Sequence, residues 1–166
     1  MGQIVLARID DRLIHGQIVT KWAPECKCTR IIIVDDDLVK VPFLCDVYEL
    51  SKPNGVDVQV RSTDSTLAEW EESSFGDDRV LLLFRNVEPA KKLIEKGMKL
   101  RQLQVGGLAA NAGRERVYLS VCCSEDEAAL LKEIEGMGVE VYFQMVPEAS
   151  AQTRAETMKN VFPKYV

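Results

Sequence analysis

Short apolar runs recur along the chain at intervals that favour a sheet with long connections. Residues 3–8, 30–34 and 79–84 are largely apolar and rich in Ile, Val and Leu, which is typical of strands buried on both faces of a parallel sheet. Residues 56–61 alternate strictly between apolar and polar, so we expect a strand nearer the edge of the sheet. The same patterns predict three further strands, over residues 103–107, 116–122 and 139–146.

Amphipathic segments separate these runs and predict helices over residues 16–23, 42–51, 65–72, 89–96, 124–134 and 151–161. Pro24 should end the first helix, and Ser124 with Glu127 forms a capping box at the start of the fifth. Strands that alternate with helices predict an α/β fold. We expect one domain over residues 1–166, with a mostly parallel sheet of six to seven strands, helices on both faces and room for an antiparallel strand at the edge.

Composition and charge narrow the class of protein. The hydrophobic fraction of 46% and the charged fraction of 28% are ordinary for a soluble globular protein. A net charge of -5 without a basic stripe argues against a nucleic-acid partner. No apolar run reaches the ~18 residues of a membrane span, and the amino terminus enters a strand without a signal peptide. The protein is therefore expected to be cytoplasmic.

The cysteines give no support for a disulfide framework or a metal site. There are five, an odd number, and Cys122 and Cys123 are adjacent. Cys26 and Cys28 have the spacing C-x-C, but no second cysteine pair or histidine cluster completes a zinc site. We expect no disulfide, no metal and no cofactor.

The segment of residues 9–17 carries the strongest chemical signal. It contains His15, the one histidine of the chain, where the first strand passes into a helix. The carboxyl end of a strand is the usual place for a site in an α/β protein, and a helix start favours an anion. Arg12 offers a fork of donors to phosphate oxygens, and Asp10 could hold one ring nitrogen while the other attacks phosphorus. This chemistry suits a phosphohistidine carrier.

Other loops should meet the His15 loop at the same edge of the sheet. They are residues 35–37, Arg85 with Asn86, and a glycine pair, Gly106 and Gly107, expected to form a tight turn under the site. Trp22 is expected to lie in the core or to face a partner. Two alternatives to the carrier are a binding module that holds a phosphorylated ligand without accepting its phosphoryl group, and a receiver-like regulatory domain. Nucleotide-binding and hydrolase motifs are missing.

Residues 5–18 resemble the amino-terminal signature of the IIB components of the mannose/sorbose class of the sugar phosphotransferase system (PTS). The signature here is Val5-x-x-Arg8-Ile9-Asp10-Asp11-Arg12-Leu13-Ile14-His15-Gly16-Gln17-Ile18, followed by Trp22. Softer similarity continues through Ile33-Val34-Asp35-Asp36, Val105-Gly106-Gly107, Val139-Glu140-Val141 and Gln144-Met145-Val146-Pro147. The resemblance spans essentially the whole chain.

The resemblance implies a phosphotransferase whose site lies on this loop. Members accept a phosphoryl group from the phosphorylated IIA component and pass it to a sugar that enters through the membrane components IIC and IID, with which they associate peripherally. His15 matches the phosphorylated position, with Nδ1 as the expected acceptor atom. Arg12 and Asp10 match the residues that contact phosphate and hold the histidine.

Four residues are expected to support the phosphate or its loop: Gly16, Gln17, Asp36 and Arg85. The family often has Asn-Asp where this chain has Asp35-Asp36. A second carboxylate pointing inward would repel the phosphoryl group, so we expect Asp35 to face solvent or to pair with Arg85. Other IIB classes accept phosphate on a cysteine at the end of the first strand, a position occupied here by Asp10 and Asp11.

Overall fold

The computed structural model describes residues 1–166 and contains a seven-stranded sheet in the order β3-β2-β4-β1-β5-β8-β9. Every neighbouring pair is parallel except β8 and β9, which are antiparallel at one edge. The predicted fold class is therefore confirmed, including the antiparallel edge strand. The strands are β1 Gln3–Asp10, β2 Arg30–Val34, β3 Asp57–Arg61, β4 Arg79–Phe84, β5 Gln102–Gly107, β8 Glu140–Phe143 and β9 Gln152–Thr153.

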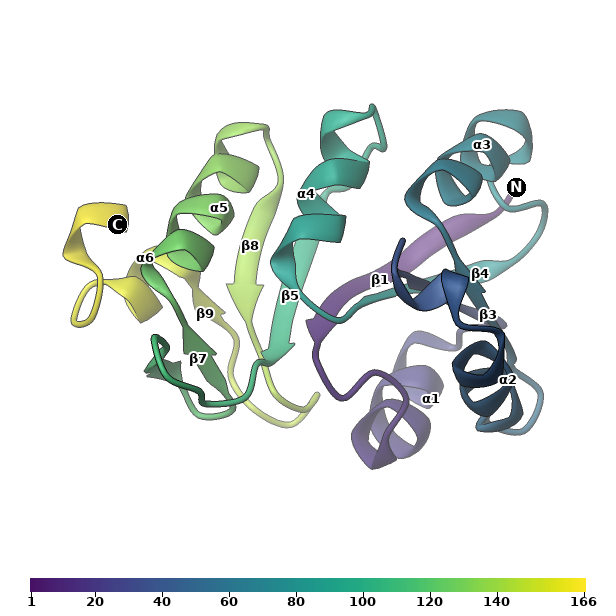
Figure 1. The fold of residues 1–166 in the computed structure, drawn as a ribbon, viewed down its shortest axis with the longest axis horizontal. Coiled ribbons are helices and arrows are strands. Elements are labelled where there is room, and N and C mark those ends of the chain that lie inside the picture. The colour runs from purple at the N-terminus through teal and green to yellow at the C-terminus, as the bar shows by residue number, and fades with distance from the viewer.

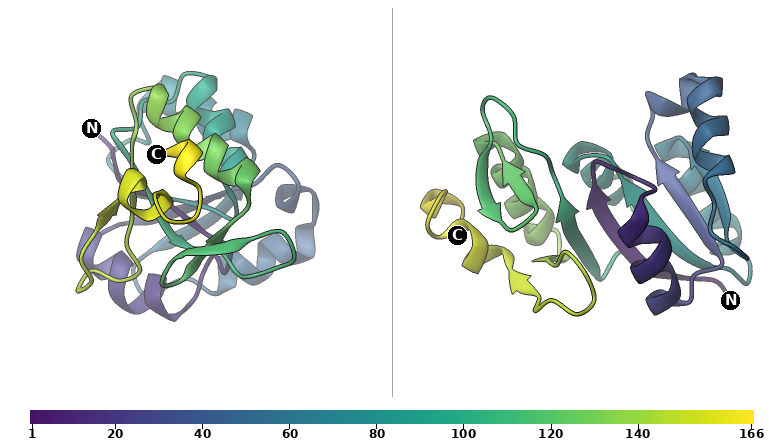
Figure 2. Two further views of the ribbon diagram at one scale, coloured as in Figure 1. Left: turned by 90° about the vertical axis from the view of Figure 1, so that its left-hand side faces the viewer. Right: turned by 90° about the horizontal axis from the view of Figure 1, so that it is seen from below.

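Helices cover both faces of the sheet (Figure 1). On one face lie α3 (Thr63–Ser73), α4 (Val87–Glu95) and α5 (Glu125–Gly136). On the other face lie α1 (Ala23–Cys26), which follows the short helix η1 (Ile18–Trp22), and α2 (Pro42–Leu50), which follows η2 (Leu38–Lys40). Seen from below, α1 and α2 lie in front of the strands (Figure 2). The chain ends with α6 (Arg154–Met158) and η3 (Pro163–Tyr165).

Two apolar cores result from the alternation of side chains along each strand. In β4, Val80, Leu82 and Phe84 join the core beneath α3, α4 and α5, which has 27 buried residues. Leu81 and Leu83 of the same strand join a smaller core of 13 buried residues on the face of α1 and α2. Because successive strand residues point to opposite faces, each core receives every second residue.

The first helix does not end at Pro24, so that prediction was wrong. A π-helical turn over η1, in which the Ala23 N–H donates to the Ile18 carbonyl, leads directly into α1 and carries the helix on to Cys26. Proline lacks an N–H and its ring clashes with the carbonyl four residues earlier in a regular α-helix. The wider π turn changes that pairing just before the proline.

Two expected strands and the last helix also differ from the sequence prediction. Residues 116–122 form a hairpin, β6 (Glu115–Tyr118) and β7 (Val121–Cys123), because Tyr118 turns back to pair with Val121. Strand β8 ends at Phe143 because the next two carbonyl groups bind an arginine of β1 instead of a neighbouring strand. In the segment 151–161, only α6 is helical, and β9 precedes it.

Candidate functional site

Asp10, the last residue of the central strand β1, anchors the site. Its side chain is fully buried and accepts five hydrogen bonds from Arg8, Arg12 and His15. Arg8 Nη2 lies 3.1 Å and His15 Nε2 3.0 Å from Oδ2, while Arg12 binds both carboxylate oxygens through Nε and Nη2 and donates its backbone N–H to Oδ1. Burial alone would raise the pKa of Asp10. The hydrogen bonds from His15 and Arg12 and the charge of Arg8 outweigh it, so the pKa lies well below its usual value.

The contact with Asp10 determines which nitrogen of His15 is free. An ionised carboxylate only accepts hydrogen bonds, so Nε2 carries the proton and Nδ1 keeps its lone pair. Nδ1 accepts the N–H of Gln17 at 3.3 Å, and the His15 carbonyl accepts the N–H of Val19 at 3.0 Å. His15 therefore stands at the start of the helix, with Nδ1 at its positive end. The side chain is 14% exposed, and the space around Cα of Gly16 is open.

The loop from β1 to His15 makes a tight turn, and Leu13 is its buried residue. The Leu13 N–H donates to the Asp10 carbonyl, and Leu13 adopts the left-handed conformation with φ 54°. This conformation is unfavourable for a leucine, but its side chain is fully buried in the smaller core. Asp11 fastens the loop from the other side, because its N–H donates to the Gly107 carbonyl and Oδ2 accepts the Ala109 N–H at 2.6 Å.

Arg12 links the buried carboxylate to the surface. Its side chain is 43% exposed, and besides its bonds to Asp10 it donates through Nη2 to Gln17 Oε1 at 3.2 Å. The hydrogen bond to Asp10 is the main reason why the pKa of Arg12 is raised. The structure thus brings together four sequence-predicted residues, Asp10, Arg12, His15 and Gln17, with Gly16 beside them.

Arg8 is a site residue that the sequence analysis missed. It is fully buried beneath Asp10 and donates to the side chain of Gln104, to the Gln144 carbonyl at 2.9 Å and to the Met145 carbonyl at 3.1 Å. Its Cζ lies 5.3 Å from the ring centroid of Trp22, a cation–π distance. A signal was available, since an arginine two residues before an aspartate in a buried strand lies on the same face.

The glycine pair lies in β5 and forms no turn, so that prediction was wrong. Both residues are extended, and side chains of β1 occupy the space where their Cβ atoms would be. A Cβ on Gly106 would lie 1.8 Å from Cζ of Arg8, and one on Gly107 would lie 2.8 Å from Oδ1 of Asp10. The two glycines therefore make room for the buried ion pair.

Asp35 was expected either to face solvent or to pair with Arg85. It is buried and pairs with Arg85, so the second expectation is confirmed. Arg85 Nη2 lies 3.1 Å from Asp35 Oδ2, and Oδ1 accepts the N–H groups of Asp37 and Leu38. Both carboxylate oxygens of Asp35 are therefore engaged by these neighbours.

Asp36 is held away from the imidazole by other partners. It accepts hydrogen bonds from the backbone N–H and the hydroxyl of Thr63 at the start of α3, and it forms an ion pair with Lys92 of α4. Burial alone would raise the pKa of Asp36, but the hydrogen bonds from Lys92 and Thr63 lower it. Asp36 and Arg85 line a polar cavity of about 440 Å³, and no hydrogen bond or ion pair joins them to His15.

The cysteines are all unpaired, and no three metal-ligating side chains cluster. Burial raises the pKa of Cys28 to about 11 and that of Cys123 to about 12, so both are thiols at neutral pH.

None of the helices has the length and apolar character needed to cross a membrane.

Fold and site together define a doubly wound α/β protein with a carboxylate–imidazole pair at the carboxyl end of its central strand. The chain belongs to the family described as PTS system sorbose subfamily IIB component, whose model matches residues 4–164.

Individual relatives agree with this assignment. The sorbose-specific EIIB component of Klebsiella pneumoniae is 31% identical over 144 residues, 87% of this chain and 88% of that protein. The solved structure of manxB from Thermoanaerobacter tengcongensis has 36% identity and a TM-score of 0.90, covering 98% of this chain and 99% of the other. The mannose-specific EIIAB component of Escherichia coli is 33% identical over 86% of this chain, which spans only 44% of that longer protein.

Proposed function

We propose that this protein is the phosphohistidine carrier of a sugar phosphotransferase system. His15 accepts a phosphoryl group on Nδ1 from a phosphorylated IIA component and passes it to a sugar bound by the membrane components IIC and IID. The observation that carries the proposal is the orientation of the ring, since Asp10 holds Nε2–H at 3.0 Å and leaves the lone pair of Nδ1 at a helix start.

The transfer needs no cofactor. The Nδ1 lone pair attacks phosphorus, the N–P bond of the donor histidine breaks, and its electron pair returns to the donor ring. In the second step a sugar hydroxyl oxygen attacks phosphorus, the Nδ1–P bond breaks, and the hydroxyl proton leaves to a base. Such transfers depend mainly on positioning and on stabilising the charge of the equatorial oxygens.

Two hydrogen-bond donors of this loop can stabilise that negative charge. The Gln17 N–H now donates to Nδ1, and once the lone pair is used in the N–P bond it can donate to a phosphoryl oxygen. Arg12 lies beside the ring with an exposed guanidinium, and Gly16 leaves space for the group. Asp10 stabilises the positive charge that the ring gains during attack.

Asp36 and Arg85 have a less direct role in this scheme. Both lie on loops at the same end of the parallel sheet, after β2 and β4, so a partner that reaches His15 also passes near them. We propose that they shape this edge of the sheet rather than touch the phosphoryl group.

The proposed setting follows from the same family. The whole chain, residues 1–166, acts as one IIB unit in the cytoplasm, in transient contact with IIA and with IIC and IID. The similarity to a protein named EIIAB supports the link to a IIA component. Small, short-lived interfaces suit a carrier that has to release each partner.

Phosphoryl acceptance is the direct test. The purified protein is incubated with phosphoenolpyruvate, the general PTS proteins and a mannose-class IIA component, and intact mass and phosphorus NMR are recorded. We expect one acid-labile phosphoryl group on the wild type and none on His15→Ala, with cooperative unfolding retained in both. A phosphorylated ligand that binds and leaves intact, without an adduct, would instead indicate a binding module.

A further inference from the structure

Helix α2 presents an apolar face to solvent. Phe43, Val47 and Leu50 are spaced i, i+4 and i+7, so they share one face of the helix. Their exposed fractions are 74%, 43% and 83%. In an amphipathic helix of a globular protein, the apolar face normally packs on the core. Here the other face, with Cys45 and Tyr48, packs against the smaller core and leaves the apolar stripe uncovered.

The exposed apolar side chains of the protein are concentrated at this helix. Nine large hydrophobic residues are exposed in the chain, and five of them lie within ten consecutive positions. Single exposed apolar residues are normal on a protein surface, whereas a group of them marks an interaction site. The five residues form the α2 patch: Val41, Phe43, Leu44, Val47 and Leu50.

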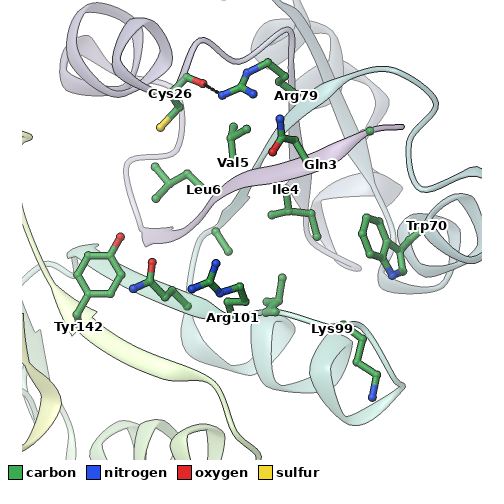
Figure 3. Close-up of a pocket in the computed structure, with 14 residues that line it drawn as sticks. Gln3, Ile4, Val5, Leu6, Cys26, Trp70, Arg79, Lys99, Arg101 and Tyr142 are labelled. Atoms are coloured by element: carbon green, nitrogen blue, oxygen red, sulfur yellow. Dashed lines mark hydrogen bonds between the residues drawn. The ribbon is translucent and has the colours of Figure 1, made fainter.

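The α2 patch is separate from the cavity of about 500 Å³ in the fork between β1 and β5. None of the residues of α2 lines that cavity. Figure 3 shows that its cationic groups do not converge, because Arg79 is turned to the Cys26 carbonyl and Arg101 lies on the other side of β1. Substitutions on the α2 patch therefore leave this cavity intact.

The size of the α2 patch favours a short-lived partner over a second copy of the chain. A stable interface buries about 800 Å² on each partner and involves about 20–30 residues a side. Five side chains of one short helix supply only part of such a contact. The helix also contains two carboxylates and no cation, so two copies joined through α2 would bring like charges together.

The charges beside the patch indicate the chemistry of the partner. Asp46 and Glu49 are the only charged residues within α2, and Asp37 is exposed in the loop before it. None of these three carboxylates forms an ion pair, and Lys40 and Lys52 lie beyond the two ends of the helix. Cytoplasmic loops of membrane proteins carry an excess of lysine and arginine. An apolar patch with free carboxylates beside it therefore fits the cytoplasmic side of a membrane protein.

One partner can reach the α2 patch and His15 together. Helix α2 follows the loop after β2, and His15 follows β1, so both lie after the carboxyl ends of parallel strands. The helix that begins at His15 leads into α1, and α1 and α2 lie on the same face of the sheet (Figure 2). A membrane component that takes the phosphoryl group from His15 can hold α2 in the same encounter.

We propose that the α2 patch is the docking surface for the cytoplasmic side of the membrane components IIC and IID. Apolar side chains of the partner cover Phe43, Val47 and Leu50, and its lysine and arginine side chains meet Asp46 and Glu49. This inference rests on the proposed carrier function and adds the surface used in its second step. Phosphoryl acceptance from IIA does not use the patch.

Docking is measured by co-sedimentation of the full chain with vesicles of phosphatidylethanolamine and phosphatidylglycerol that carry mannose-class IIC and IID. Vesicles of the same lipids without protein serve as the blank. We expect saturable binding only to the vesicles with IIC and IID, and weaker binding as salt screens the charges. Phe43→Gln/Leu50→Gln should bind at least about tenfold more weakly. Met137→Gln, at an exposed apolar residue after α5 on the opposite face, should bind like the wild type.

Phosphorylation by IIA separates this inference from the carrier function, because the binding assay needs no phosphoryl group. The wild type, the double variant and Met137→Gln should all be phosphorylated at the same rate. A wild type that is not phosphorylated would refute the carrier function. The docking surface would be overturned by a wild type that does not bind, by equal binding of the double variant, or by equal binding to the vesicles without protein. Slower phosphorylation of the double variant by IIA, or a dimer in sedimentation velocity that this variant loses, would also overturn it.

Discussion

Replacing Asp10 by asparagine perturbs the site with almost no change in side-chain size. The carboxylate accepts from Arg8, Arg12 and the Nε2–H of His15, whereas an amide has one accepting oxygen and a donating nitrogen. If the amide nitrogen faces the ring, the imidazole proton has to move to Nδ1, and the attacking lone pair is lost. We expect phosphoryl acceptance to slow by on the order of 10⁴-fold, as when a histidine-orienting aspartate is replaced by asparagine in a serine protease.

The same change should lower stability. It leaves the fully buried guanidinium of Arg8 without its counter-ion, and breaking a buried pair in this way costs about 3–5 kcal/mol. The pKa of Asp10 is depressed in the folded protein, so its ionisation contributes stability above the unfolded-state pKa of ~3.9, and that stability is lost as the pH falls below it. The variant should therefore lose less stability than the wild type on acidification.

Urea unfolding at pH 7 and at pH 3, with phosphorylation time courses at pH 7, measures both effects. Asp46→Asn, on an exposed surface without an ion pair, is the matched control. An Asp10→Asn variant that is phosphorylated at the wild-type rate would refute the assignment of Asp10 as the residue that orients the imidazole. Equal dependence of stability on pH in the variant and the wild type would refute the electrostatic argument.

Three further changes test other parts of the site. Gly106→Ala should lower the free energy of unfolding in urea by at least about 1–3 kcal/mol because its Cβ would collide with Arg8. Gly136→Ala, in open space within α5, should be neutral or slightly stabilising. Equal effects of the two changes would contradict the explanation that Gly106 makes room for Arg8. Arg12→Lys should slow phosphoryl acceptance by about tenfold, since a point charge replaces a fork, and an unchanged single-turnover rate would remove Arg12 from the site. Trp22→Phe should lower the free energy of unfolding by about 1–2 kcal/mol through loss of its indole hydrogen bond, with circular dichroism at low denaturant checking that the fold persists.

The fold could be predicted from the sequence because its signals are local. Apolar runs separated by amphipathic segments leave few alternatives to a parallel sheet with helices on both faces. Some errors were local, such as the π turn before Pro24 and the hairpin of β6 and β7, but others arose where a tertiary contact decides the outcome. Strand β8 stops at Phe143 because Arg8 binds the carbonyl groups of Gln144 and Met145, and nothing within residues 139–146 reveals that distant partner.

The part of the candidate site that lies on one loop could be predicted, because its residues are close together in the sequence. Asp10, Arg12, His15 and Gln17 lie within eight consecutive residues, so one loop brings them together. The floor of the site depends on Gln104 and Gly106 from β5, almost a hundred residues away in sequence. A strand pairing that joins such distant segments cannot be derived from spacing alone.

The division of the interior into two cores has a dynamic consequence. Leu13, Ile18 and Trp22, which hold the histidine loop, belong to the core of 13 residues and not to the core of 27. Local opening needs less free energy where fewer apolar contacts are broken, so α1 and its loop should exchange their amide hydrogens before β4 does. The protein can thus lose its histidine site through partial unfolding while most of the sheet stays intact, and gentle heating should inactivate it below the temperature of global unfolding.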